Sequence, residues 1–259
     1  MALTEKERYE NFDLAIKDEK PKADILIPLI INELGINLAN KKVIDIGSGL
    51  GYKSAKMIEY GADVLAVESD SLRTSWAVDR GILDPKRILN CYAQDIPSEL
   101  YGTFDIATIF LYRIIPGFIR GFECNSNSSV ASDINDMQLQ VTKVLAKLLK
   151  PDGIAIIEFC NAPVDYYLYY PDGSYTPLIY QMKKAFNEAE YVDTSSSRSI
   201  IIVAKKPLPA IEVDQLNYSD VCMLDLSLKK STIEVMGELI KQGCYYTGTH
   251  SPNTFVISA

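Results

Sequence analysis

The stretch from Lys41 to Gly51, KKVIDIGSGLG, is an apolar run that contains one acid and is followed by three glycines at alternate positions. Short apolar runs of this kind are typical of strands buried on both faces of a parallel sheet. Glycines directly after such a strand let the backbone pass close to a ligand, because they carry no side chain. The stretch therefore predicts a buried strand that leads into a binding loop, with Asp45 beside that loop.

The spacing of these glycines separates two classes of ligand. The G-x-G-x-x-G fingerprint of dinucleotide-binding proteins requires glycine at position 52, where this chain has Tyr52. The sequence DIGSGLG, from Asp45 to Gly51, resembles instead the first motif of class I S-adenosylmethionine-dependent methyltransferases. The resemblance covers roughly residues 20–206. It implies a Rossmann-like, doubly wound α/β fold, in which a mostly parallel seven-stranded sheet ends in an antiparallel edge hairpin.

The pattern along the chain agrees with that fold. Apolar runs alternate with helix-like stretches, which predicts a parallel sheet with helices on both faces. The last two strands are too close for a helical crossover, so they are expected to pair antiparallel. The expected strands are 43–46, 64–67, 88–92, 106–111, 154–159, 191–194 and 199–204, and the expected helices between them are 52–60, 71–79, 133–149 and 177–189.

Further elements are expected at both ends of the chain. A polar helix over residues 4–18 and a second helix starting at Pro21 form a helical cover within residues 1–40. The junction KKPLPAIEV marks a boundary near residue 207. We therefore predict a methyltransferase domain over 1–206 and a small C-terminal α/β appendage over 207–259. The appendage is too small for a core of its own and is expected to pack on the main domain or to join a homo-oligomer.

Composition limits the partners and the compartment. The chain has 259 residues and a net charge of −8, which repels a phosphate backbone and makes a nucleic-acid partner unlikely. Its five cysteines are scattered and odd in number, which favours reduced thiols. The charged N-terminus is unlike a signal peptide, and no stretch is apolar for long enough to span a membrane. A cytoplasmic protein is expected.

The resemblance implies a set of residues that bind the methyl donor. It places Asp45 near the amino end of S-adenosylmethionine, and the glycine loop near the methionine and ribose parts. Glu68 follows the second strand, where a carboxylate accepts hydrogen bonds from both ribose hydroxyls, although the same acid would also serve NAD. Asp95 and the Ile96 backbone amide are expected at the adenine. The full predicted set is Asp45, Gly47, Ser48, Gly49, Gly51, Glu68, Ser69, Asp95, Ile96 and Phe110.

The fourth strand, in FDIATIFLYRIIPGF, is where classes of methyl acceptor differ. Enzymes that methylate amino nitrogens of bases or of glutamine often carry an Asn/Asp-Pro-Pro-aromatic signature there, which this chain lacks. Arginine methyltransferases place two glutamates in the region, and only Glu123 lies between Leu111 and Met137. Metal-dependent catechol-type enzymes need carboxylates there, whereas Asp105 is expected at the opposite edge of the sheet. No metal is implied.

Two residues remain at the functional edge after that strand. Tyr112 can orient or deprotonate a nucleophile, and Arg113 can hold a substrate carboxylate or phosphate. Packing or solvent exposure is the alternative for both. The residues that follow, 114–132, are expected to form a long loop of the kind that often serves as a lid.

Tyrosines are concentrated after the fifth strand, beginning at Tyr166. They can line an aromatic substrate pocket or cage an alkylamine, or they can simply pack at the edge. Other candidates for a base are Glu123, Asp165, a water molecule and His250, the only histidine.

The sequence thus predicts methyl transfer from S-adenosylmethionine to an unidentified small molecule or protein side chain, with S-adenosylhomocysteine as the second product. Two alternatives stay open: an NAD(P)-dependent oxidoreductase, and a catalytically silent module that binds the donor. A polyamine synthase that uses a decarboxylated donor is more remote, because the chain lacks its more glycine-rich first loop and paired catalytic acid.

Overall fold

The computed structural model describes residues 4–110, 130–159, 178–193 and 200–216. Seven strands form one sheet in the order β3-β2-β1-β4-β5-β7-β6. The first five strands run parallel, and β7 lies antiparallel between β5 and β6. This is the predicted sheet, including its antiparallel hairpin. The strands are β1 (Lys42–Ile46), β2 (Asp63–Val67), β3 (Ile88–Leu89), β4 (Phe104–Ile109), β5 (Leu149–Phe159), β6 (Phe186–Asp193) and β7 (Ile200–Pro207).

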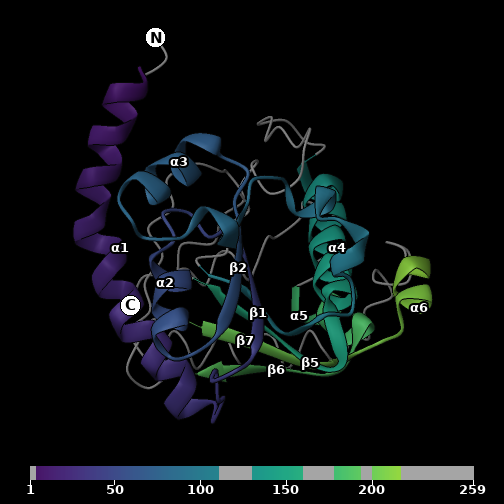
Figure 1. Ribbon diagram of the computed structural model, residues 1–259. Coiled ribbons are helices and arrows are strands. Elements are labelled where there is room, and N and C mark those ends of the chain that lie inside the picture. The colour runs from purple at the N-terminus through teal and green to yellow at the C-terminus, as the bar shows by residue number, and fades with distance from the viewer. Residues whose placement is uncertain (1–3, 111–129, 160–177, 194–199, 217–259) are drawn as a thin grey trace, which may run out of the picture.

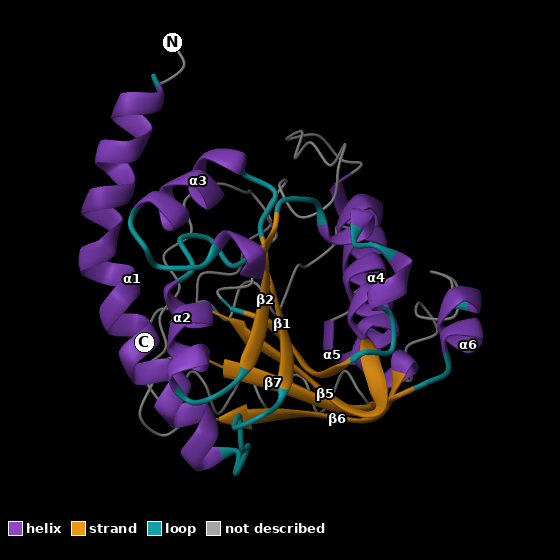
Figure 2. Cartoon of the chain, in the orientation of Figure 1, coloured by secondary structure: helices purple, strands orange, loops and turns teal. Residues whose placement is uncertain are grey.

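Helices cover both faces of the sheet, as Figures 1 and 2 show. On one face, Leu26 and Ile27 of the first helix share an apolar core with Val43 of β1. On the other face, Leu145 and Met182 share a core with strand residues of the central sheet. The helices are α1 (Glu5–Glu33), α2 (Tyr52–Glu59), α3 (Ser71–Asp79), α4 (Val130–Leu148), α5 (Leu178–Ala185) and α6 (Ala210–Gln215).

Helix α1 is continuous, so the prediction of two helices that meet at Pro21 is wrong. The helix starts with a capping box between Thr4 and Glu7, and it contains both Pro21 and Pro28. A proline inside a helix removes one backbone hydrogen bond and crowds the preceding turn, which usually ends or bends the helix. Here both halves of α1 are packed, because Phe12 contacts the core cluster around Trp76 and Ile27 lies in the core on the sheet. Packing therefore outweighs the local cost of the proline.

Two predicted boundaries also differ from the structure. The expected helix 177–189 ends at Ala185, and β6 begins at once with Phe186. Phe186 is buried in the core and its neighbours Asn187 and Glu188 are exposed, so tertiary pairing with β7 decides the switch to a strand. The third strand is limited to Ile88–Leu89 because only these residues pair with β2.

The described part of the predicted appendage packs on the main domain. Val213 of α6 is fully buried in the core beneath α4, and Lys147 of α4 forms an ion pair with Asp214. Residues 217–259 lie outside the described residues. The boundary near 207 and the α/β character of the appendage therefore stay predictions.

Candidate functional site

The candidate site lies at the carboxyl end of β1, where the strand order of the sheet reverses. Strand β1 pairs with β2 on one side and with β4 on the other. Ligands of open α/β sheets bind at the carboxyl ends of the strands at such a point, because the flanking connections leave on opposite faces there. The glycine loop that follows β1 starts at this point.

The glycine loop is bound to the end of β2. The backbone N–H groups of Gly47 and Ser48 both donate to the Val67 carbonyl, at 2.8 and 3.0 Å. The N–H of Gly49 donates to Glu68 Oε2 at 2.9 Å. The loop and the predicted ribose-binding acid therefore form one connected unit.

Two of the loop glycines occupy positions that other residues would strain. Gly51 caps helix α2 with a φ of 82°, and a Cβ there would stand 2.6 Å from Leu83 Cδ1. Gly49 has a φ of 60°, and a Cβ there would stand 3.9 Å from Glu19 Oε2. Helix α1 thus passes over the loop and brings the carboxylate of Glu19 next to it.

Asp45 is buried beneath the loop, with 1% of its surface exposed. Its Oδ2 accepts a hydrogen bond from Ser54 Oγ at 2.5 Å, and its Oδ1 accepts one from Thr108 Oγ1 at 2.9 Å. Burial raises the pKa of Asp45 to about 6, although both hydroxyls and the positive charge of Lys53 oppose this rise. Such a buried acid acts on a ligand through its charge or through intervening groups. The sequence prediction that it serves the amino end of a donor is compatible with this position.

The buried carboxylate of Glu68 accepts two backbone hydrogen bonds. Its Oε2 accepts from Gly49, and its Oε1 accepts from the N–H of Asp70 at 2.9 Å. An ionised carboxylate offers about four acceptor positions, so each oxygen of Glu68 keeps one for a further donor. Two vicinal hydroxyls supply such a pair of donors.

The predicted adenine residues lie together just after β3. Asp95 is exposed in a short 3-10 turn, Ala93–Asp95, and the Ile96 side chain is buried. The Ile96 N–H donates to the Ala93 carbonyl at 3.4 Å, a long hydrogen bond within the turn. Ser69 lies between Glu68 and Asp70 in the β2–α3 connection and is half-buried.

Phe110 follows β4 and is buried in the core on the α1 face. The structure therefore brings together the glycine loop, Asp45, Glu68 and the turn around Asp95, and places the Phe110 ring within the core. The predicted roles of all these residues toward a donor stay predictions. The acceptor-side candidates Tyr112, Arg113, Glu123, Asp165, Tyr166 and His250 lie outside the described residues.

Several residues that shape the site were missed by sequence reasoning. Ser54 and Thr108 hold Asp45, and the side-chain amide of Asn90 donates to the Glu68 carbonyl at 2.7 Å. Thr108 could have been identified from the sequence, because it is a polar residue inside an apolar strand and is paired in register with Asp45. The position of Glu19 near the loop could not, because it depends on how the distant helix α1 packs.

Asp105 lies at the opposite edge of the sheet, as predicted. Its carboxylate accepts from the N–H of Lys42, the first residue of β1, and pairs with Lys150 Nζ, both at 2.8 Å. Within the described residues, no group of three or more acidic, histidine or cysteine side chains is arranged to hold a metal ion. Among the described helices, none is both long and apolar enough to cross a membrane.

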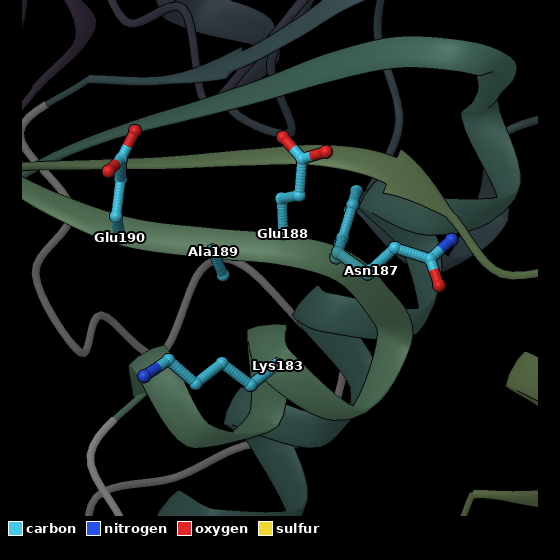
Figure 3. Close-up of a pocket in the computed structure, with 6 residues that line it drawn as sticks. Lys183, Asn187, Glu188, Ala189 and Glu190 are labelled. Atoms are coloured by element: carbon cyan, nitrogen blue, oxygen red, sulfur yellow. The ribbon is translucent and has the colours of Figure 1, made fainter.

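A surface depression exists elsewhere on the molecule. It is lined by Lys183 of α5 and by Asn187, Glu188 and Glu190 of β6 (Figure 3). Strand β6 is the outermost strand and is separated from β1 by β4, β5 and β7. This depression is therefore distinct from the glycine-loop site.

Comparison with protein-family models found no match, and a search of curated proteins found none either. Solved structures with a similar fold include a protein from Pyrococcus horikoshii OT3, at 18% identity over 73% of this chain and 91% of that one, with a TM-score of 0.49. They include magnesium protoporphyrin IX methyltransferase from Synechocystis PCC 6803, at 16% identity over 72% and 79%, with a TM-score of 0.45. An O-methyltransferase family protein from Burkholderia thailandensis matches at 14% identity over 77% and 59%, with a TM-score of 0.49.

At these identities and scores, the similar structures carry no information about activity or substrate. The strand order and the glycine loop are properties of this chain. Both agree with the resemblance read from the motif between Asp45 and Gly51. The chain has the fold of the class I S-adenosylmethionine-dependent methyltransferases.

Proposed function

We propose that this protein is an S-adenosylmethionine-dependent methyltransferase that acts on a small molecule or a protein side chain. The observation that carries the proposal is the hydrogen bond that the Gly49 N–H donates to the Glu68 carboxylate. This hydrogen bond joins a glycine-rich loop to an acceptor for vicinal hydroxyls, at the carboxyl edge of the sheet. A nucleoside with an extended amino-acid chain fits both parts of this unit.

The alternative cofactor, NAD(P), fits the same place less well. Dinucleotides lay their pyrophosphate on a helix N-terminus that is opened by a third glycine. Here that position is Tyr52, the first residue of α2, and its ring lies 6.4 Å from the ring of Trp76. The tyrosine is thus part of a packed aromatic cluster, which favours the methyl donor over a dinucleotide.

When bound, the donor supplies an electrophilic methyl group, which a nucleophile of the acceptor takes while the sulfonium becomes a neutral thioether. Most of the protein's task is to hold the two partners in line. Glu68 binds the ribose hydroxyls, and the glycine loop lets the amino-acid part of the donor lie close to the backbone. Asp95 accepts a hydrogen bond from the adenine amino group. Tyr112 is our candidate for orienting or deprotonating the nucleophile, and Arg113 for binding an anionic group of the acceptor.

The class of acceptor follows from charge. A net charge of −8 disfavours approach to a polyanion, so we propose a small molecule or a protein side chain rather than a nucleic acid. Sequence-independent and salt-sensitive binding to DNA or RNA would overturn this part of the proposal.

The test combines binding and turnover. Calorimetric titration with S-adenosylhomocysteine and with NADH separates the two cofactors, and transfer from methyl-labelled donor into a fractionated cell extract identifies the acceptor class. We expect binding of S-adenosylhomocysteine and label in at least one fraction. Binding of NADH alone would indicate an oxidoreductase, and binding of S-adenosylhomocysteine without transfer would indicate a catalytically silent module.

A further inference from the structure

Glu158 is a buried acid near the carboxyl end of β5, and the donor contacts described above do not use it. Only 4% of its surface is exposed. Side chains alternate between the two faces of a strand, so Glu158 lies on the same face as Ile156, which belongs to the core that α1 covers. Its paired residue in β7, Ile201, belongs to the same core. An ionisable group is therefore set among apolar residues at the functional edge of the sheet.

Glu158 and Asp45 lie on the same face of the sheet, on either side of β4. Asp45 is paired in register with Thr108 of β4, and Thr108 with Ile156 of β5. Glu158 is two residues beyond Ile156, towards the carboxyl edge. With strands about 4.8 Å apart and about 3.3 Å per residue, the Cα atoms of Asp45 and Glu158 are on the order of 12 Å apart. Glu158 is thus beside the candidate site and is separated from its donor residues by one strand.

The predicted donor contacts run across the sheet in one direction. The turn with Asp95 follows β3, Glu68 follows β2 and the glycine loop follows β1, and these strands are neighbours in the order β3-β2-β1. A donor held by these residues has its adenine at β3, its ribose at β2 and its amino-acid part at β1. The next strands in the sheet are β4 and β5. The edge near Glu158 is therefore the part that remains for the methyl acceptor.

The buried charges of this region are mostly negative. Among the buried side chains of the described residues, three are acids, Asp45, Glu68 and Glu158, and one is a lysine, Lys53. Charges act over longer distances and more strongly where water is excluded. A negatively charged nucleophile is repelled under these conditions, whereas a neutral or cationic one is favoured. Among the nucleophiles that accept a methyl group, amines meet this condition.

An amine gains positive charge during methyl transfer. Its nitrogen lone pair forms the new N–C bond, the C–S bond breaks with its electron pair going to sulfur, and the positive charge passes from sulfur to nitrogen. A carboxylate that accepts a hydrogen bond from an N–H of this nitrogen stabilises the charge as it develops, and it takes the proton that the product releases. A buried glutamate beside the acceptor's place can perform both tasks.

We propose that Glu158 accepts a hydrogen bond from the nucleophilic nitrogen of the acceptor, and that this acceptor is a primary or secondary amine of a small molecule or a protein side chain. The proposal rests on the proposed function, because it takes methyl transfer from S-adenosylmethionine as the reaction. Glu158 contacts the acceptor and not the donor. Its loss is therefore expected to slow transfer without weakening donor binding.

The acceptor class is tested with the full-length wild type. A cell extract is treated with N-hydroxysuccinimide acetate, which acetylates amines, and then with hydroxylamine, which frees any acetylated hydroxyls. Transfer from methyl-labelled S-adenosylmethionine is compared between this extract and a mock-treated one. We expect acetylation to abolish transfer, because an amide nitrogen has no available lone pair. Undiminished transfer after acetylation would overturn the proposal.

The role of Glu158 is tested with Glu158→Gln, which keeps the size of the side chain and removes its charge. We expect the rate of transfer into the mock-treated extract, at saturating donor, to fall about 10²- to 10³-fold. The affinity for S-adenosylhomocysteine, measured by calorimetry, should change less than about twofold, since that ligand does not contact Glu158. A purely structural role would instead lower the affinity and the rate together.

Two matched variants complete the set. Glu158→Asp retains the charge and should recover part of the lost rate. Glu190→Gln removes an exposed acid from β6, at the edge of the same sheet, and should leave both the rate and the affinity unchanged. If Glu158→Gln does not fold, the acetylation experiment on the wild type still decides the acceptor class.

The outcomes separate this inference from the proposed function. A wild type that binds no S-adenosylhomocysteine, or that binds it without any transfer, would overturn both. A wild type that transfers the methyl group equally well into acetylated extract, or a Glu158→Gln variant with an unchanged rate, would overturn this inference alone.

Discussion

The carboxylate of Glu68, at the end of β2, accepts a hydrogen bond from the backbone N–H of Gly49, in the loop after β1. Its second oxygen accepts from the N–H of Asp70. Because Glu68 is buried, these two bonds fix the distance between the loop and the start of α3. One side chain therefore both shapes the loop and presents acceptor positions to a ligand.

The substitution Glu68→Gln tests this double role. A glutamine amide has one oxygen and one NH2 group, so the NH2 group must face the N–H of either Gly49 or Asp70 and repel it. We expect the free energy of unfolding to fall by about 1–3 kcal/mol and the affinity for S-adenosylhomocysteine to fall about 10- to 100-fold. Urea denaturation and calorimetry measure the two effects.

The same substitution has a distinctive ligand profile. Methylthioadenosine keeps the nucleoside but lacks the amino-acid group. Because the ribose is common to both ligands, Glu68→Gln should weaken the binding of methylthioadenosine as much as that of S-adenosylhomocysteine. The control is Glu59→Gln, because the side chain of Glu59 is 64% exposed and pairs with Lys56. Unchanged affinity for both ligands in Glu68→Gln would contradict the ribose assignment.

The Gly51→Ala substitution should be more damaging than Gly81→Ala. Both glycines have positive φ, 82° and 65°, but a Cβ at Gly51 would stand 2.6 Å from the buried Leu83, whereas a Cβ at Gly81 meets nothing within 4 Å. Backbone strain alone costs about 1–2 kcal/mol, and the clash adds about 1–3 kcal/mol for Gly51. Urea unfolding of both variants measures the difference, and equal losses would show that Leu83 moves aside freely.

The fluorescence of Trp76, the only tryptophan of the chain, reports on the packing of the N-terminal half of α1. Phe12 of α1 meets the fully buried Trp76 edge to face, with ring centroids 6.3 Å apart. We expect Phe12→Ala to shift the tryptophan emission to the red, to increase its quenching by acrylamide, and to lower the free energy of unfolding by about 1–3 kcal/mol. The control is Leu14→Ala, because Leu14 is 61% exposed on the same helix. Equal spectra for the two variants would mean that α1 does not shield Trp76.

The central strands were predictable because their signal is local. Runs such as Val64 to Val67 are apolar without interruption, which is typical of a strand buried on both faces. The boundary between α5 and β6 was not predictable in this way, because the residues around Phe186 suit either state and pairing with β7 decides. The prediction of a helix start at Pro21 was wrong for the same reason. The residues that pack against α1 and keep it continuous are far from Pro21 in the sequence.

In the candidate site, too, local sequence identified some residues, whereas others depend on how the chain packs. Glu68 was found because it directly follows a short apolar run, where parallel strands place residues at the functional edge. Asp95 was found through the resemblance, which expects an acid after the third strand. Thr108 could have been found by combining the sheet order with register, which sets it opposite Asp45. The position of Glu19 could not have been found from the sequence, because it depends on how helix α1 packs over the loop.

The buried Asp45 makes the stability of the unliganded protein depend on pH. Burial raises its pKa from 3.8 to about 6, so the folded state holds the proton more tightly than the unfolded state does. The contribution of Asp45 to stability therefore rises as the pH is lowered from 6 to 4, and well above pH 6 the ionised group costs about 3 kcal/mol. Relative to Asp45→Asn, which has no such titration, the wild type should lose about 2.5 kcal/mol of unfolding free energy between pH 4 and pH 7. Urea unfolding of both proteins across this range measures it, and a constant difference would mean that Asp45 is not desolvated. Any fixed effect of the amide on Ser54 or Thr108 cancels, because only the slope with pH is compared.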